Sequence, residues 1–182
     1  MPALCERLGG RVRGLFSGRR AYVSATLAVL ALDQIVKLVV ERSLPLHESL
    51  PIVPGLLQLT RVHNRGAAFG LFSEADLPFQ SQLFAFVSIL ALGAIVIYAW
   101  RLSSERHLPQ IAVALVIGGA LGNLTDRIVR GYVIDFIDVY WRIHHWPMFN
   151  VADSAISVGV ALLILDMLLE PGEPASDTKA TP

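Results

Sequence analysis

The sequence predicts an all-α integral membrane fold, in which four transmembrane helices are joined by segments that carry a small sheet and a short interfacial helix. Three observations lead to this prediction. Of the 182 residues, 54% are hydrophobic and only 16% are charged, which is too apolar for an ordinary soluble domain. Four apolar stretches approach the roughly 20 residues that a helix needs to cross a hydrocarbon core. The polar motifs lie at the ends of these stretches and in the two long segments between them.

The four apolar stretches cover residues 21–40, 83–100, 111–125 and 151–169. The first follows a run of arginines, as a signal peptide does, but it is longer than a signal h-region and contains Asp33 and Lys37. We therefore expect it to be a retained helix. The second stretch carries no charge. The third is short, and we expect it to continue through Asp126 and Arg127.

The basic residues predict the orientation of the chain. Arg19 and Arg20 adjoin the first span, which places the N-terminus in the cytoplasm under the positive-inside rule. Four spans return the C-terminus to the same side, so both long connecting segments are expected outside. The chain then divides into a basic cytoplasmic extension, a four-helix membrane domain and a disordered cytoplasmic tail, at residues 1–20, 21–169 and 170–182.

Two outer segments show patterns of secondary structure. Residues 57–60 alternate apolar and polar side chains, which predicts a half-exposed strand in a small sheet resting on the membrane. Between the third and fourth spans, apolar and aromatic residues recur at helical spacing from Val133 to Trp141. This predicts a short amphipathic helix in the interface. The same stretch is rich in Val, Ile and Tyr, so a strand is the alternative.

Several polar residues at the span ends have two interpretations. Asp33 and Lys37 are four residues apart with the acid first, which favours an ion pair on one helix face; direct catalysis by Lys37 is the less favoured alternative. Asp126 and Arg127 are adjacent, so their side chains should diverge. The planar fork of Arg127 suits backbone carbonyls or a phosphate group, or it snorkels to the interface. Asn123 could bind a substrate backbone or a neighbouring helix.

Asp135 and Asp153 form the candidate catalytic pair, with Asp138 as the local rival of Asp135. Asp153 opens the fourth span, where the helix dipole favours an acid, so it also has a structural interpretation. If Asp135 and Asp153 meet, two like charges cannot both ionise easily, and the pair holds a single proton. The ionised partner can then take a proton from water while the protonated one polarises a carbonyl. That is amide hydrolysis without a metal or a covalent intermediate.

Composition argues against other functions. The formal net charge is zero, so nucleic-acid binding has no electrostatic footprint. Cys5 is the only cysteine, and the five histidines lack metal-ligand spacing, so we expect neither a metal nor a cofactor. A small proton-coupled transporter is the main alternative function, but it would place its carboxylates near mid-membrane. A noncatalytic scaffold has no need of two convergent aspartates.

Five motifs occur in order along the chain: Asp-Gln-x-x-Lys, Asn-x-Gly-Ala-Ala-Phe-Gly, Gly-Asn-x-x-Asp-Arg, Val-x-Asp-Phe and Phe-Asn-x-Ala-Asp, starting at residues 33, 64, 122, 133 and 149. With these motifs, residues 22–169 resemble the bacterial lipoprotein signal peptidase family, the aspartic peptidases of the cytoplasmic membrane. The basic extension at 1–20 is longer than the minimal start of that family.

The resemblance implies a four-helix fold with an extracytoplasmic β-cradle, in the bacterial cytoplasmic (inner) membrane, with the active site on the outer face. It also implies removal of the signal peptide from diacylglyceryl-modified prolipoproteins by a cut just before the lipidated cysteine. The expected partners are these substrates and membrane lipids, and the chain is expected to be a monomer. Motif by motif, Asp135 and Asp153 are the catalytic pair. The residues expected to bind substrate are Asn64, Asn123, Asp126, Arg127 and Asn150.

Overall fold

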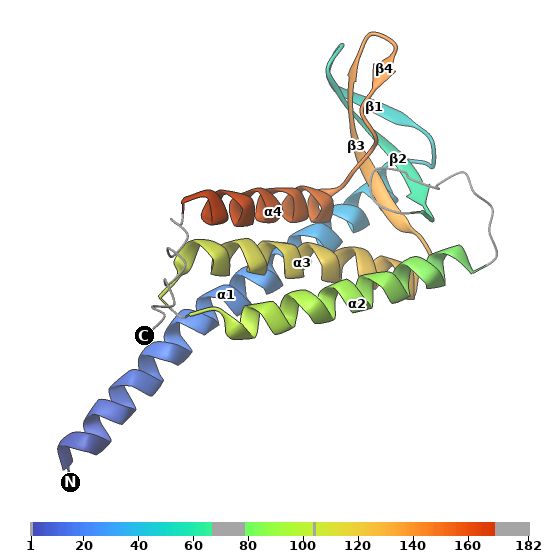
Figure 1. The fold of residues 1–182 in the computed structure, drawn as a ribbon. Helices are drawn as coiled ribbons and strands as arrows, with labels where there is room; N and C mark the ends of the chain where they lie inside the picture. The colour runs from blue at the N-terminus through green and yellow to red at the C-terminus, as the bar shows by residue number, and fades with distance from the viewer. Residues whose placement is uncertain (1, 67–78, 104, 170–182) are drawn as a thin grey trace, which may run out of the picture.

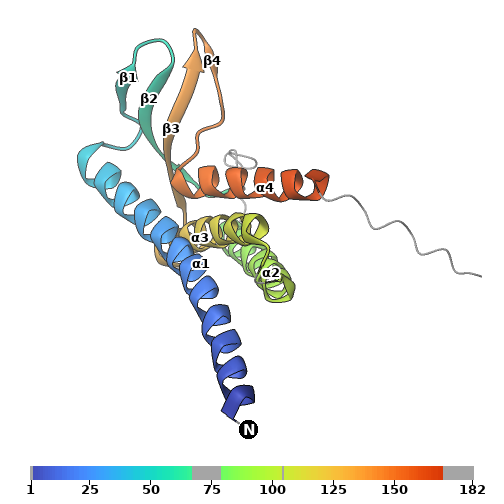
Figure 2. The same cartoon turned by 90° about the vertical axis from the view of Figure 1, so that its left-hand side faces the viewer.

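The computed structural model describes residues 2–66, 79–103 and 105–169. It contains four long helices, α1 (Pro2–Ser43), α2 (Gln80–Arg101), α3 (His107–Val129) and α4 (Val151–Leu169) (Figure 1). Its four strands are β1 (Ser49–Val53), β2 (Leu57–Asn64), β3 (Val133–Trp141) and β4 (His144–His145). The strands gather at one end of the helices, and the described N-terminus lies at the other (Figures 1 and 2).

Four helical segments are long and apolar enough to cross a membrane, which confirms the four expected spans. They are Arg20–Ser43, Gln80–Arg101, His107–Val129 and Val151–Leu169. The third continues beyond Asp126 and Arg127, as expected. Helix α3 packs against the other three helices. Glycine permits this approach: a Cβ at Gly118 would lie 2.8 Å from the carbonyl oxygen of Thr26 in α1.

The strands form one antiparallel arrangement in the order β1-β2-β3-β4. The strand expected at residues 57–60 is therefore confirmed as the start of β2. In the pairing of β2 with β3, Val62 lies opposite Asp135 and Gln58 lies opposite Asp138. The fold is thus four membrane-length helices with a small antiparallel sheet, which the class all-α does not describe.

The prediction of a short interfacial helix from Val133 to Trp141 is wrong, because this stretch is strand β3. The alternative of a strand is correct. The first four residues of β3 are buried, so apolar side chains point to both faces of the strand and do not alternate with polar ones. Burial on both faces removed the period of two that would have distinguished the strand from a helix.

The sheet is fixed to the end of α1 by apolar and polar contacts. Val40 of α1 forms an apolar cluster with Ile134 and Phe136 of β3. From β2, the guanidinium of Arg61 donates hydrogen bonds of 3.0 Å and 3.3 Å to the carbonyl oxygens of Glu41 and Leu44. These carbonyls lie at the C-terminal end of α1, where helical partners run out. Strand β3 is therefore held in a defined position against the helices.

The division of the chain into a basic extension, a membrane domain and a tail stays a prediction. Helix α1 begins at Pro2, so its backbone runs through most of the expected extension. The expected tail at 170–182 lies outside the described residues, as do positions 67–70 of the second motif.

Candidate active site

Asp135 projects from β3 and is only 2% exposed. Both of its carboxylate oxygens accept hydrogen bonds from side-chain amides. Nδ2 of Asn64 lies 2.9 Å from Oδ2, and Nδ2 of Asn150 lies 2.7 Å from Oδ1. Strand β2 and the segment before α4 therefore hold this carboxylate from two sides.

Asp153 lies in the first turn of α4 and is 7% exposed. It forms a reciprocal cap with Asn150: the Asp153 N–H donates to Oδ1 of Asn150 at 2.9 Å, and the Asn150 N–H donates to Oδ2 of Asp153 at 3.3 Å. Such a capping box satisfies two N–H groups that a helix start leaves unpaired. Nδ2 of Asn123 donates to the other oxygen, Oδ1, at 2.8 Å. Asp153 is thus both part of the helix cap and a fixed carboxylate.

Two asparagines connect the aspartates. Asn150 donates hydrogen bonds to both Asp135 and Asp153. Its Nδ2 also lies 3.1 Å from Oδ1 of Asn123, and Nδ2 of Asn123 in turn donates to Asp153. Both aspartates line one cavity of about 460 Å³. The structure therefore brings together the two carboxylates that were singled out from the sequence.

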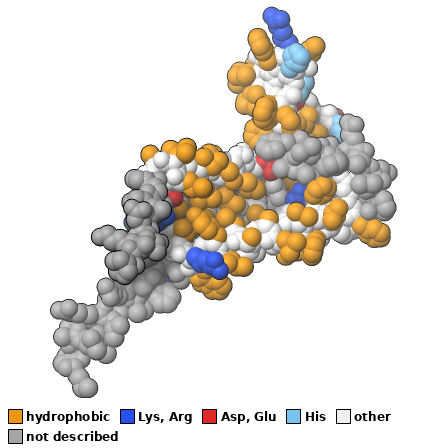
Figure 3. Space-filling model, viewed as in Figure 1, with side chains coloured by type: hydrophobic (Ala, Val, Ile, Leu, Met, Phe, Trp, Pro, Cys, Tyr) orange, Lys and Arg blue, Asp and Glu red, His pale blue; other side chains and the backbone are white. Residues whose placement is uncertain are grey.

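The cavity has a polar end and a long apolar wall. Its polar lining comes from β2, β3 and the nearby ends of α3 and α4, and comprises Asn64, Asn123, Arg127, Asp135 and Asp153. The apolar wall comes mainly from α2, with contributions from α3 and α4, and includes Phe84, Val87, Leu92, Ile95, Val116 and Ile156. On the face drawn in Figure 3, many hydrophobic side chains are also exposed over the described helices. The carboxylates thus face a space that suits a ligand with a polar and an apolar part.

Burial, together with the charge of nearby Asp153, raises the pKa of Asp135 to about 7. The hydrogen bonds from Asn64 and Asn150 stabilise the ionised form and offset only part of this effect. Near neutral pH, Asp135 therefore exchanges a proton readily, which a general acid or base requires.

Asp138 belongs to a different cluster. Residues three apart on a strand point to opposite faces, so Asp138 turns away from Asp135. Its carboxylate accepts hydrogen bonds from Gln58 at 2.7 Å and Thr60 at 3.3 Å, and it pairs with Nδ1 of His145 at 2.8 Å. Of the two aspartates, Asp135 is the one that lines the cavity with Asp153.

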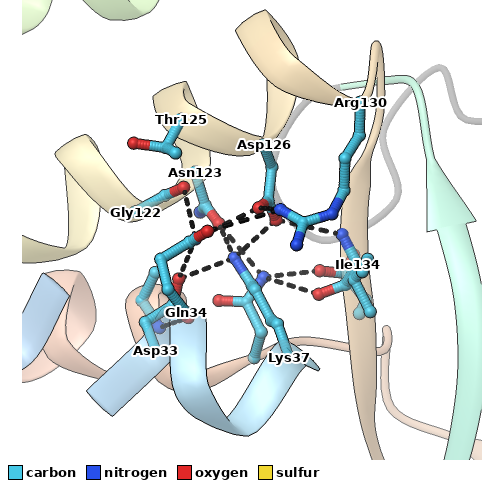
Figure 4. Close-up of polar contacts among 12 residues, drawn as sticks. Asp33, Gln34, Lys37, Gly122, Asn123, Thr125, Asp126, Arg130 and Ile134 are labelled. Atoms are coloured by element: carbon cyan, nitrogen blue, oxygen red, sulfur yellow. Dashed lines mark hydrogen bonds and ion pairs between the residues drawn. The ribbon is translucent and has the colours of Figure 1, made fainter. Parts of the chain in front are cut away.

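Behind the cavity lies a buried network of charges centred on Lys37 (Figure 4). Its Nζ lies 2.8 Å from Oδ2 of Asp33, 2.8 Å from Oδ2 of Asp126 and 2.9 Å from Oδ1 of Asn123. The ion pair expected between Asp33 and Lys37 is therefore confirmed. Lys37 and both aspartates have fully buried side chains.

Asp126 and Arg127 diverge, as their adjacency on a helix predicts. Asp126 points into the network, where it also pairs with Arg130 at 2.6 Å, and it is not among the residues that line the cavity. Arg127 lines the cavity and donates a hydrogen bond of 3.0 Å to the carbonyl oxygen of Gly66. Its Nε is buried without a hydrogen-bond partner among the described residues.

Sequence reasoning missed two members of the network. Gln34 donates to Asp126 at 3.1 Å, and Arg130 contacts both Gln34 and Asp126. Arg130 lies four residues after Asp126 on the same helix, a spacing that could have revealed the ion pair. No charged residue marks the part of α2 that forms the apolar wall, so the cavity itself could not be found from the sequence.

No group of three or more His, Cys, Asp or Glu side chains is placed to hold a metal ion in the part of the chain that the structure describes. Chemistry without a metal stays a prediction.

Comparisons with known proteins agree on one family. The family model described as signal peptidase (SPase) II matches residues 25–169. A lipoprotein signal peptidase of Geobacter sulfurreducens is 48% identical over 151 residues, which cover 83% of this chain and 93% of the relative. That of Geobacter metallireducens is 45% identical over 158 residues, covering 87% and 96%. Among solved structures, a bacterial membrane enzyme determined by the in meso method at 2.3 Å is similar, with a TM-score of 0.73 and 30% identity, covering 89% of this chain and 93% of that one.

Proposed function

The chain belongs to the signal peptidase II family, whose members are proteases that cleave the signal peptides of prolipoproteins, and we propose that Asp135 and Asp153 are its catalytic pair. The observation that carries this assignment is that both carboxylates line one cavity and are bridged by Asn150. Membership of a protease family leaves the alternative of a proton-coupled transporter without support.

In the proposed reaction, Asp153 is the ionised base and Asp135 is the protonated acid. Asp153 suits the base because it lies at a helix N-terminus and accepts hydrogen bonds from Asn123 and a backbone N–H. Asp135 suits the acid because burial raises its pKa to about 7. A water molecule between them gives its proton to Asp153 and attacks the carbonyl carbon, while Asp135 donates its proton to the carbonyl oxygen.

The tetrahedral intermediate then collapses, and the two carboxyl groups exchange roles. The C–N bond breaks, and the leaving nitrogen takes the proton that Asp153 had accepted. Asp135 recovers a proton from the hydroxyl group as the carbonyl forms again. Each carboxyl group ends the cycle as it began, so no cofactor is needed.

We assign the substrate as a diacylglyceryl-modified prolipoprotein, cut just before its lipidated cysteine. The apolar wall beside the polar end of the cavity supports this choice, because acyl chains and a peptide must lie next to each other there. Acyl chains contribute about 0.8 kcal/mol per CH₂ when they leave water. They are already buried in the bilayer before the substrate binds, so they place the scissile bond at the right depth more than they increase affinity.

Of the five residues expected to bind substrate, Asn64, Asn123 and Arg127 line the cavity. The buried Nε of Arg127 lacks a hydrogen-bond partner among the described residues, and a substrate carbonyl would supply one. Asn150 and Asp126 act from behind the cavity. Asn150 holds both catalytic carboxylates, and Asp126 holds Lys37.

The membrane orientation is also part of the proposal. The sheet forms the outer β-cradle, with the active site on the outer face of the cytoplasmic membrane and both termini in the cytoplasm. Arginines at the far end of the helices, including Arg20 and Arg101, support this orientation under the positive-inside rule. The proposed peptidase domain covers residues 21–169 and acts as a monomer.

The test is release of a signal peptide by the purified protein in lipid bilayers. A diacylglyceryl-modified prolipoprotein should be cleaved, and mass spectrometry should place the lipidated cysteine at the new N-terminus. The matched control is the same precursor without lipid, which should be cleaved far more slowly. Equal cleavage of the two precursors would contradict the substrate assignment.

A further inference from the structure

The buried ammonium of Lys37 has a role that the proposed reaction does not explain. An ammonium has three N–H donors. In this structure each has one acceptor: Asp33, Asp126 and the neutral side chain of Asn123. The carboxylates of Asp33 and Asp126 balance the charge of the ammonium. Charge compensation therefore does not explain why the third donor contacts Asn123.

That contact decides which way the Asn123 amide points. An ammonium has no acceptor, so the atom of Asn123 that faces Lys37 must be Oδ1. Asn150 donates to the same oxygen at 3.1 Å. Nδ2 of Asn123 is therefore turned toward Oδ1 of Asp153, 2.8 Å away. A flipped amide would set donor against donor at Lys37 and oxygen against carboxylate at Asp153.

The two acids that hold Lys37 also reach the backbone beside each catalytic residue. Oδ1 of Asp33 accepts a hydrogen bond of 2.9 Å from the N–H of Ala152, the neighbour of Asp153. Oδ2 of Asp126 accepts one of 3.2 Å from the N–H of Ile134, the neighbour of Asp135. Lys37 thus stands between two carboxylates that anchor the segments carrying the pair.

We propose that Lys37 is a positioning residue, which acts through Asn123 to hold the Asp153 carboxylate in register with Asp135. This inference rests on the proposed function. No hydrogen bond or ion pair of the described residues joins Lys37 directly to either catalytic aspartate, so the Asn123 amide is the connecting group. The charges that face Lys37 are Asp33 and Asp126, with Arg130 on the far oxygen of Asp126.

The alternative route is the charge of Lys37 acting on the pair at a distance, and two variants separate the routes. Both are made in an Asp33→Asn background, which keeps the acceptor for Ala152 and balances the charge of the network once Lys37 is neutral. Lys37→Met removes the charge and the donor. Lys37→Gln removes the charge but retains an amide donor for Asn123. We expect Lys37→Met to lower kcat roughly 10–100-fold, with KM changed less than about twofold, and Lys37→Gln to recover much of the loss. Equal losses in the two variants would overturn the proposal in favour of charge.

A double-mutant cycle with Asn123→Ala completes the test. If Lys37 acts through Asn123, Lys37→Met should cost less than about threefold further in kcat once Asn123 is alanine. Fully multiplicative losses would overturn the proposal. Every variant is first checked for a cooperative thermal transition in detergent, which shows that it is folded. Asp135→Asn is measured alongside. Activity in that variant would overturn the proposed function itself, whereas the double-mutant cycle tests only the positioning role of Lys37.

Discussion

The side-chain amide of Asn64 donates a hydrogen bond of 2.9 Å to Oδ2 of Asp135. The bond links the end of β2 to the neighbouring strand β3. The amide stabilises the ionised carboxylate and so opposes burial, which raises the pKa of Asp135 to about 7. The balance between these two effects sets the pH range over which Asp135 holds a proton.

We predict that kcat/KM falls as the pH rises through about 7, because Asp135 must be protonated to act as the acid. Asn64→Ala removes a donor to the ionised form, so the alkaline limb should move to higher pH, with a lower maximum. A pH profile of cleavage for both proteins checks this. Asp138→Asn serves as the control and should leave the limb in place. A shift to lower pH in Asn64→Ala would contradict the acid role of Asp135.

The stability of the folded protein should depend on pH because the pKa of Asp135 is raised. The pKa of Asp135 rises from 3.8 to about 7 on folding, so the folded state binds more protons between these values, and stability falls as the pH rises. Asp135→Asn removes this cost. The variant should melt a few degrees above the wild type at about pH 8, with a smaller difference at about pH 5. An Asp135→Asn protein less stable at the higher pH would show that the carboxylate is not destabilised by ionisation.

Arg127 should bind substrate rather than transfer protons, because its guanidinium stays charged at any working pH. Arg127→Lys retains the charge and loses the planar fork, whereas Arg127→Ala loses both. We expect a higher KM in both variants and a much larger increase for alanine. Titration with lipidated precursor separates KM from kcat. An unchanged KM in a folded Arg127→Ala protein would assign the side chain to the chemical step or to snorkelling.

Activity should survive EDTA and cysteine alkylation. The polar lining of the cavity offers two carboxylates, amides and a guanidinium, and the single cysteine, Cys5, lies in the N-terminal extension. The measurement is cleavage after treatment with each reagent, with untreated protein as the reference. Loss of activity in EDTA that zinc restores would contradict the aspartic mechanism.

Local spacing predicted much of the fold and the site. Four helices followed from apolar length, and the Asp33–Lys37 pair followed from a separation of four residues on one helix face. What spacing could not supply was pairing between distant segments. Asp135 and Asp138 are equivalent in a list of acids, and only their alternation on a strand separates them.

The same limit applies to the network and the cavity. Lys37 and Asn123 are 86 residues apart, and no periodicity relates them. The apolar and aromatic residues of β3 also recur at helical spacing, and its buried start does not alternate apolar with exposed polar residues, so the sequence predicted a helix there. The wall from α2 carries no charged side chain, and its one serine, Ser88, bonds its own helix at the carbonyl of Phe84, so nothing in the sequence distinguishes a cavity from a lipid-facing surface.

The central claim is that Asp135 and Asp153 together carry the reaction, and the most direct test is the cleavage rate of three single variants on lipidated precursor. Asp135→Asn and Asp153→Asn should each lose activity by roughly 10²–10⁴-fold or more, because each carboxyl group performs a separate proton transfer. Asp138→Asn, a matched change on the same strand but on the opposite face, should retain most of the activity. Loss of cleavage in Asp138→Asn with activity retained in Asp135→Asn would contradict the account.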